Sequence, residues 1–411
     1  MPSEDLTIPA AIGVSIEYMI VDRSTLELKP IVGELLSSLE EEGEQKIAAG
    51  KCLKWKPGYQ PHIFRICSDS PQTNLNTLEH AIADELRIVN RLLAEFGAML
   101  LPGGMHPLTD PLKIATLPVS DPVGQLQERL FDTKGHSWVN LNRTYVELPY
   151  ENEEMLQRLQ TAIRIVLPII PALSASSPIV EGGNTGKTDN ALRYARARYS
   201  RFPGIAGQLI PEPYFSERKY TEMVLDKIRH QLEPVDPQGL IHPAQINFRS
   251  AIPDFQGKRM ILQIMEPQEC VAADMAIVRL VTEAIRFFLE EKTIRFEEQM
   301  EARMEILCGI LEDVMVSGRN TEVFSSEYLA FFGLDEVCTV GNIWQHLFQK
   351  LSNDPLRPLA MYEHELSVIL KQGSLSERIL TVVGEKPGKE ELVFMWRRLI
   401  DCLEQNRLFI L

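Results

Sequence analysis

The chain has 411 residues, of which 45% are hydrophobic, 24% charged and 7% aromatic. This composition is that of an ordinary globular protein, and the length predicts two or three domains or one large one with a substantial core. The net charge of −15 disfavours nucleic acid or a membrane surface as the main partner, because a field of that sign repels phosphates and anionic lipid.

The expected elements divide the chain into a strand-containing first part and a helical remainder. Strands are predicted at 13–22, 62–68, 98–101, 143–148, 244–249 and 259–266, and helices at 32–42, 75–97 and 152–174. We expect Pro168 and Pro171 to kink the last of these helices or to end it. From about residue 272 onward the pattern is almost wholly helical. Because regular strand–helix alternation is missing, we expect an α+β fold with an antiparallel sheet.

Targeting signals are missing from the pattern. The longest apolar run, 163–180, contains Arg164 and several prolines, so it does not predict a membrane span. The first residues are acidic and lack the basic region of a secretory signal. Six cysteines are scattered without a Cys-x-x-Cys spacing, which is typical of reduced thiols. These features predict a cytoplasmic protein.

Several polar side chains fall on predicted strands with a spacing of two, which places them on one face of a strand. On 13–22 the alternate residues Val14, Ile16, Tyr18 and Ile20 predict the buried face. The pairs expected on a second, shared face are Ser15 with Glu17, Tyr145 with Glu147, and Ile261 with Gln263. We expect these surfaces to converge on one cleft lined by the sheet.

Four segments resemble motifs of the bacterial glutamate–cysteine ligase and carboxylate–amine ligase family. Their order and spacing agree with that family over about residues 12–290, and the Ser-Ala-Ser-Ser-Pro block is the most specific. The four segments are GVSIEYMIVD (13–22), PGGMHP (102–107), ALSASSPIVEGGNTG (172–186) and RMILQIMEPQECVAADMA (259–276).

The resemblance implies a fold similar to that of glutamine synthetase, in which a curved antiparallel sheet forms a funnel closed by helices. It implies a ligase-type domain over 1–290 and a helical region over 291–411 that packs on it. The implied activity joins a small-molecule carboxylate to an amine through an acyl phosphate, with ATP and magnesium as cofactors. An oligomer is also expected.

The resemblance breaks down where metal ligands are expected. Ser15 replaces the first glutamate of the opening strand, so Glu17 is the remaining metal candidate there. Arg65 falls where the second strand should carry a glutamate, and a cation at that position would repel Mg²⁺. The Glu-x-Arg-x-x-Asp strand carries Ile261 and Gln263 in place of its first two signature residues.

Other candidate site residues follow from the same alignment. The His/Asn pair of the family's middle strand aligns with Tyr145 and Glu147, and Glu147 is retained as a catalytic candidate. Arg249 is the candidate for pairing with a substrate carboxylate. The predicted nucleotide-binding residues are Thr185, Gly186 and Arg193, the last lying two residues beyond Ala191, where the family's arginine is expected. A rearranged metal site could also use Asp69 and Glu266.

The glycine-rich segment GGNTGKT (182–188) lacks the first glycine of a P-loop, because Glu181 stands there. We therefore interpret it as the nucleotide-side loop of the family, with a flexible connection as the alternative. The basic run that follows is either a solvated face or a phosphate site. It contains Arg193, Arg196, Arg198 and Arg201.

Two functional hypotheses remain open. The chain is a carboxylate–amine ligase with an altered site, whose parent activity is weakened or lost. Alternatively, it is a non-catalytic partner or regulatory subunit of an active, paralogous ligase, or a small-molecule binder.

Overall fold

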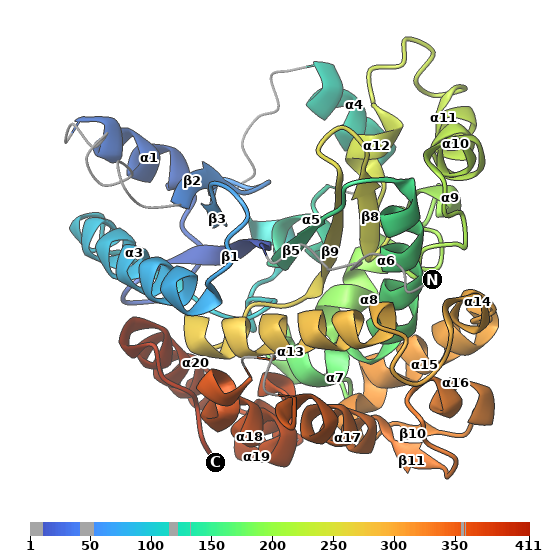
Figure 1. The fold of residues 1–411 in the computed structure, drawn as a ribbon. Helices are drawn as coiled ribbons and strands as arrows, with labels where there is room; N and C mark the ends of the chain where they lie inside the picture. Colours follow the sequence, from blue (N-terminus) through green and yellow to red (C-terminus); the bar gives the residue numbers. More distant parts are fainter. Residues whose placement is uncertain (1–10, 42–52, 115–121, 132, 355–356, 358) are drawn as a thin grey trace.

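The computed structural model describes residues 11–41, 53–114, 122–131, 133–354, 357 and 359–411 (Figure 1). Within these residues, seven strands form one sheet in the order β2-β3-β1-β5-β9-β8, and β4 pairs with the second half of β1. Every pairing in the sheet is antiparallel. The strands are β1 (Gly13–Asp22), β2 (Leu53–Pro57), β3 (Ile63–Ser68), β4 (Ala98–Leu101), β5 (Thr144–Pro149), β8 (Ala251–Asp254) and β9 (Arg259–Met265).

Helices surround this sheet and form most of the second half of the chain. Two small hairpins, β6 (Ile179–Val180) with β7 (Gly183–Asn184) and β10 (Glu322–Val323) with β11 (Cys338–Thr339), lie among them. Up to residue 246 the helices are α1 (Val32–Glu41), α3 (Leu75–Glu95), α4 (Pro122–Leu130), α5 (His136–Val139), α6 (Glu153–Val166), α7 (Pro171–Ser174), α8 (Asn190–Ala197), α9 (Pro203–Ala206), α10 (Glu217–Tyr220), α11 (Asp226–Leu232) and α12 (Pro243–Ile246). The later helices are α13 (Val271–Leu289), α14 (Phe296–Met300), α15 (Met304–Ser317), α16 (Ser326–Phe331), α17 (Val340–Ser352), α18 (Glu363–Gln372), α19 (Leu375–Val383) and α20 (Lys389–Gln405).

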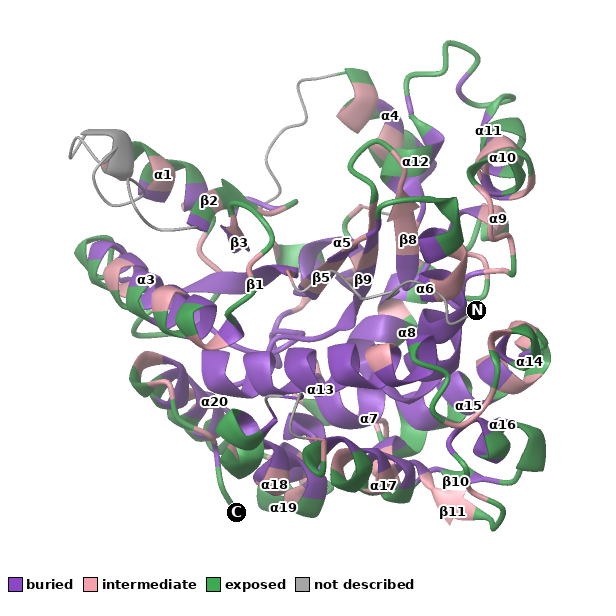
Figure 2. Ribbon diagram, viewed as in Figure 1, coloured by how far each residue is buried: buried purple, intermediate pink, exposed green. Residues whose placement is uncertain are grey.

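The core lies between one face of the sheet and helix α13. The alternate β1 residues Val14, Ile16, Tyr18 and Ile20 are all fully buried and join the same apolar cluster as α3, α6 and α13. Figure 2 shows α13 buried along nearly its whole length, between the sheet and the C-terminal helices. Most side chains of α13 are apolar, as is typical of a helix in such an enclosed position, and its arginines pair with its glutamate. The expected mixed fold with an antiparallel sheet is therefore confirmed, while the funnel shape stays a prediction.

Two local differences from the sequence expectations have simple causes. The strand predicted at 244–249 is wrong: Pro243 opens the short helix α12, where its missing N–H is tolerated, and the His242 ring accepts from the Ala244 amide. The neighbouring strand β8 begins only at Ala251. Strand β2 was not expected, because only five residues form it at the sheet edge.

The helix predicted at 152–174 ends early, as the two prolines indicated. Helix α6 stops at Val166, a 3₁₀ turn covers Leu167–Ile169, and Pro171 begins α7. The main apolar cluster reaches from Ile12 to Leu403. The proposed domain boundary at residue 290 stays a prediction.

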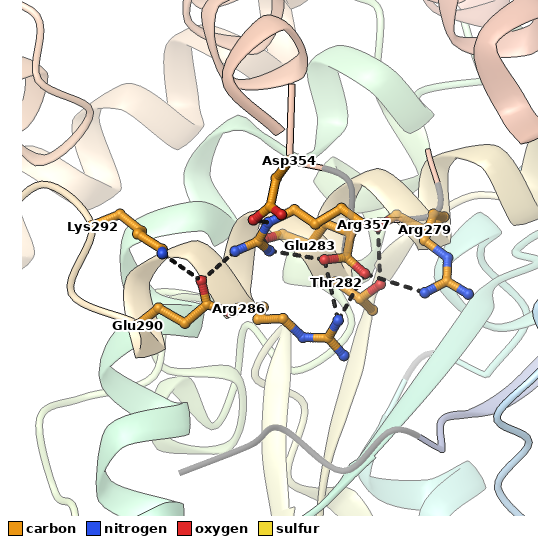
Figure 3. A network of polar contacts seen from close by, with 8 residues as sticks. All are labelled: Arg279, Thr282, Glu283, Arg286, Glu290, Lys292, Asp354 and Arg357. Atoms are coloured by element: carbon orange, nitrogen blue, oxygen red, sulfur yellow. Dashed lines mark hydrogen bonds and ion pairs between the residues drawn. The ribbon is translucent and has the colours of Figure 1, made fainter. Parts of the chain in front are cut away.

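A buried ionic network fixes α13 to the segment before α18 (Figure 3). The Glu283 carboxylate, 1% exposed, lies 3.2 Å from the guanidinium of Arg279, 3.2 Å from that of Arg286 and 2.9 Å from that of Arg357. Arg357 also pairs with Glu290. Because a buried charge needs partners of opposite sign, this network anchors the helix on which the sheet packs.

Within the described part of the chain, no helix has the length and apolar character required to cross a membrane.

Candidate functional site

The sheet face opposite α13 carries the polar residues that the strand pattern predicted. We define the polar sheet face as Ser15, Glu17, Arg65, Tyr145 and Gln263. The antiparallel register places Glu17 opposite Arg65, and Ser15 opposite Tyr145. Four segments that are far apart in sequence thus meet on this face, as the period-two pattern indicated.

Glu17 and Arg65 form an ion pair at the centre of this face. The Arg65 Nε donates to Glu17 Oε1 at 3.0 Å, and Arg65 Nη2 pairs with the same oxygen. The other oxygen, Oε2, accepts the backbone N–H of Arg143 at 3.1 Å. Glu17 is 4% exposed, so its negative charge is neutralised in a largely enclosed place. Burial, followed by the charge of Glu17, raises the pKa of Tyr145 to about 12, which keeps the phenol neutral at physiological pH.

These residues do not fit a magnesium cage. Mg²⁺ requires an octahedral set of oxygen ligands, of which carboxylates are the usual protein contribution. Glu17 is the one carboxylate among the five residues of the polar sheet face, and it already accepts from the Arg65 guanidinium. Glu147, two residues from Tyr145 on the same side of β5, is likewise paired with an arginine, Arg259. No group of three or more His, Cys, Asp or Glu side chains with metal-binding geometry occurs in the described ranges.

Two further arginines lie beside this face. The Arg143 guanidinium lies 4.4 Å from the Phe248 ring centroid, and its Nη1 donates to the Gln263 carbonyl at 2.5 Å. The Arg198 guanidinium lies 3.8 Å from the Trp138 ring centroid. Burial lowers the pKa of Arg143, and the nearby Arg198 charge lowers it further against the opposing effect of Tyr145. These two arginines place positive charge beside the polar sheet face, whose own Glu17 and Arg65 charges balance each other.

The Arg198 side chain also lines a cavity of about 340 Å³. Other lining residues come from α4, α5 and α8 and from the segments that follow them, and they include Phe131, His136, Tyr194 and Arg201. The His136 ring is held by Asn140 Nδ2, which donates to Nδ1 at 3.1 Å, and by Glu181 Oε1, which lies 3.0 Å from Nε2. A larger cavity of about 630 Å³, lined by His62, His106 and Lys389 among others, contains none of the predicted site residues.

The two predicted catalytic residues have protein partners. All three nitrogens of Arg249 donate within the chain: Nε to Glu212 Oε2 at 2.5 Å, Nη2 to Glu212 Oε1 at 2.7 Å, and Nη1 to Ile205 O at 3.1 Å. Glu147 Oε2 accepts from Arg259 Nη1 at 2.8 Å. Pairing of Arg249 with a substrate carboxylate would therefore require Glu212 to be displaced, and both roles stay predictions.

Two of the predicted nucleotide-side residues lie on the loop before α8, and the third lies on α8 itself. Thr185 Oγ1 and the Asn190 side chain exchange hydrogen bonds of 2.9–3.0 Å. Gly186 is exposed, and its φ of +72° suits glycine. Arg193 is exposed on α8, with its guanidinium 5.5 Å from the Tyr194 ring centroid. These three residues stay predictions as ligands of ATP.

Glu266 lies at the meeting point of the family-like motifs and away from the polar sheet face. Its carboxyl accepts from the Ser176 N–H and from Ser177 Oγ, the latter at 2.5 Å. A Cβ at Gly104, in PGGMHP, would lie 2.5 Å from the Glu266 Cδ, so only glycine fits there. Three of the matching segments thus enclose one buried carboxyl group, which explains them as supports of the scaffold.

Its surroundings favour the neutral, protonated form of the Glu266 carboxyl. Burial, followed by the adjacent negative charge of Asp189, raises the pKa of Glu266 well above its ordinary value. Asp189 Oδ2 is buried and accepts no other hydrogen bond from the described residues. A protonated Glu266 carboxyl would donate to it.

The raised pKa of Glu266 predicts that the stability of the fold depends on pH. The folded chain holds the proton more tightly than the unfolded chain, so unfolding releases it above the ordinary carboxyl pKa of 4.5. The free energy of unfolding should fall as pH rises from about 4.5 toward the raised pKa. Glu266→Gln, which stays neutral, should flatten that slope in urea titrations at several pH values. Exposed Glu154→Gln is the control, and an unchanged slope in Glu266→Gln would contradict the prediction.

The sequence is similar to one family model and to several known proteins. Residues 66–230 match the model of glutamate-cysteine ligase family 2. The chain is 26% identical over 97% of its length to an uncharacterized protein of Archaeoglobus fulgidus, all of which is covered. It is 23% identical over 53% of its length to a protein of Roseiflexus sp. named "Putative glutamate--cysteine ligase 2", of which 52% is covered.

A solved structure shares the fold of this chain. A bifunctional glutathione synthetase from Pasteurella multocida superposes with a TM-score of 0.60 at 9% identity, over 96% of this chain and 51% of that chain. The chain therefore spans about half the length of the Roseiflexus ligase and of this synthetase. The likeness to the synthetase concerns the fold, and the resemblance to the glutamate–cysteine ligase family is confirmed.

Proposed function

We propose that this chain, which resembles the glutamate–cysteine ligase family, has lost the magnesium- and ATP-dependent joining reaction and instead binds a small acidic molecule beside its polar sheet face. The family resemblance supports a carboxylate–amine ligase-like protein that acts on small molecules. The loss of the joining reaction and the binding of a small acid are the two parts of our proposal. The alternative role, as a partner or regulatory subunit of an active homologue, stays a prediction.

The ion pair between Glu17 and Arg65 is the observation that carries this proposal. Formation of an acyl phosphate from ATP accumulates negative charge, which this class of reaction neutralises with divalent cations. Here the remaining carboxylate of the opening strand is bound to a guanidinium, and the first carboxylate is replaced by Ser15. Loss of one directed charge-stabilising group typically lowers a rate by about 10²–10³.

Isothermal titration with ATP in the presence of Mg²⁺ tests the proposal. We expect no magnesium-dependent heat at millimolar nucleotide, and none in Ser15→Glu, because Arg65 still neutralises Glu17. The double variant Ser15→Glu/Arg65→Glu removes the cation and supplies three carboxylates, so it should gain Mg²⁺ affinity. Magnesium-dependent nucleotide binding by the unmodified chain, with phosphate release in the presence of an acid and an amine, would overturn the proposal.

A further inference from the structure

We infer that Arg198 and Arg201 form, without any metal ion, the anion-binding end of a pocket for a small, flat organic acid. The inference rests on the proposed function, since it names the class of ligand and the place where it binds. Its basis is the charge, the free donors, and the size and lining of the cavity beside the polar sheet face.

The charge balance around Arg198 is incomplete. Arg143 is 8% exposed and close enough to Arg198 for the two positive charges to interact. The described residues place no carboxylate within ion-pair distance of either guanidinium, although Glu17 and Asp189 act on Arg143 from farther away. Two neighbouring cations in an enclosed place favour an anion between or beside them.

The donors of Arg198 are free and fixed in direction. Its guanidinium makes no hydrogen bond to any described residue, and its Nε is enclosed without a partner. The group lies against the Trp138 ring at 3.8 Å and within 5.1 Å of the Phe248 ring centroid. Stacking covers the flat side of the guanidinium and leaves its N–H edge for a carboxylate or phosphate. A fork that is already oriented loses little freedom on binding.

The cavity has the size and lining for a small aromatic acid. Its volume of about 340 Å³ lies at the lower end of the range for small-molecule sites. Phe131 and Tyr194 supply apolar wall, and Arg201, held by Leu130 O at 3.1 Å, adds a second cation. The basic run after the glycine-rich loop therefore serves, in two of its four arginines, as an anion site.

Direct titration in the presence of EDTA tests the inference. The probes are benzoate and phenyl phosphate, with inorganic phosphate to measure the anion alone and benzamide as the neutral analogue. We expect benzoate or phenyl phosphate to bind with EDTA present and benzamide to bind at least tenfold more weakly. The tighter of the two acids identifies the anion as carboxylate or phosphate.

Three variants locate the site. Arg198→Gln should weaken binding about 10- to 100-fold, because it removes a charged, bidentate donor. Arg201→Gln, at an exposed position that tolerates change, should weaken it about 3- to 10-fold. Arg129→Gln removes the same charge from the nearby exposed surface of α4 without lining the cavity, and should leave binding unchanged.

The outcomes separate this inference from the proposed function. Lack of binding by either acid, equal binding of benzamide, or unchanged affinity in both Arg198→Gln and Arg201→Gln would overturn the inference. None of these results restores magnesium-dependent nucleotide binding, so the proposed loss of the ligase reaction would stand. Conversely, magnesium-dependent ATP binding by the unmodified chain, with phosphate release in the presence of an acid and an amine, would overturn the proposed function, whether or not the probe acids bind.

Discussion

Replacing Arg378 by methionine is expected to lower the free energy of unfolding by about 3–5 kcal/mol, the usual effect of removing one partner from a buried ion pair. Arg378 on α19 and Glu269, which follows β9, are both 0% exposed. Arg378 Nη1 donates to Glu269 Oε1 at 2.5 Å, and its Nε donates to Gly373 O at 3.2 Å. Methionine fills part of the volume but leaves the Glu269 charge enclosed. Urea unfolding followed by circular dichroism measures the loss.

Two matched variants isolate the cause. The double change Arg378→Met/Glu269→Gln removes the stranded charge and should recover at least half of the loss. Arg87→Met breaks the exposed pair with Asp84, whose side chains are 50% and 61% exposed, and should cost less than about 1 kcal/mol. Equal losses in Arg378→Met and Arg87→Met would contradict the assigned role of burial.

Glu283→Gln is expected to have an effect of similar size, about 3–5 kcal/mol, because this buried carboxylate contacts three guanidiniums. Figure 3 shows Arg279, Arg286 and Arg357 directed at Glu283 from two segments. Glutamine keeps the shape and removes the charge, so the three cations repel one another across the centre of α13. The midpoint of urea unfolding should fall accordingly.

The peripheral acid of the same network supplies the comparison. Glu290 is 34% exposed and pairs with Arg357 at the rim, so Glu290→Gln should cost less than half as much as Glu283→Gln. Added salt should change the Glu290→Gln loss more than the Glu283→Gln loss, because solvent ions screen the rim. The reverse order of the two losses would show that Glu283 is not the centre of the network.

Much of the fold could be predicted from local pattern. Strand β1 has the predicted bounds, and in its first half the period-two alternation separates Val14 and Ile16 from Ser15 and Glu17. Helix α3 has a long apolar stripe and an Asn74 cap that accepts from the Thr77 amide. Strand β2 and helix α12 were missed because such short elements depend on tertiary neighbours more than on their own pattern.

The candidate site was predictable only in part. Its strand residues could be placed on one face. Ser15 and Arg65 stand where the resembling motifs predict glutamates, which already indicated a changed metal site. The arginine–aromatic cluster could not be predicted, because Trp138, Arg143, Arg198 and Phe248 come from segments whose approach depends on the whole fold. The ion pair of Arg249 with Glu212 could not be predicted either, because Glu212 lies in a loop 37 residues earlier.

The contacts of Glu269 have a consequence for folding during synthesis on the ribosome. Glu269 Oε1 accepts a hydrogen bond of 3.1 Å from the backbone N–H of Phe409, which lies 140 residues farther along the chain. At about 5–20 residues per second, translation needs roughly 7–28 s to supply that partner. During this interval the carboxylate must remain hydrated. We therefore expect Glu269 to reach its buried position late in folding, after Arg378 and Phe409 have been synthesised.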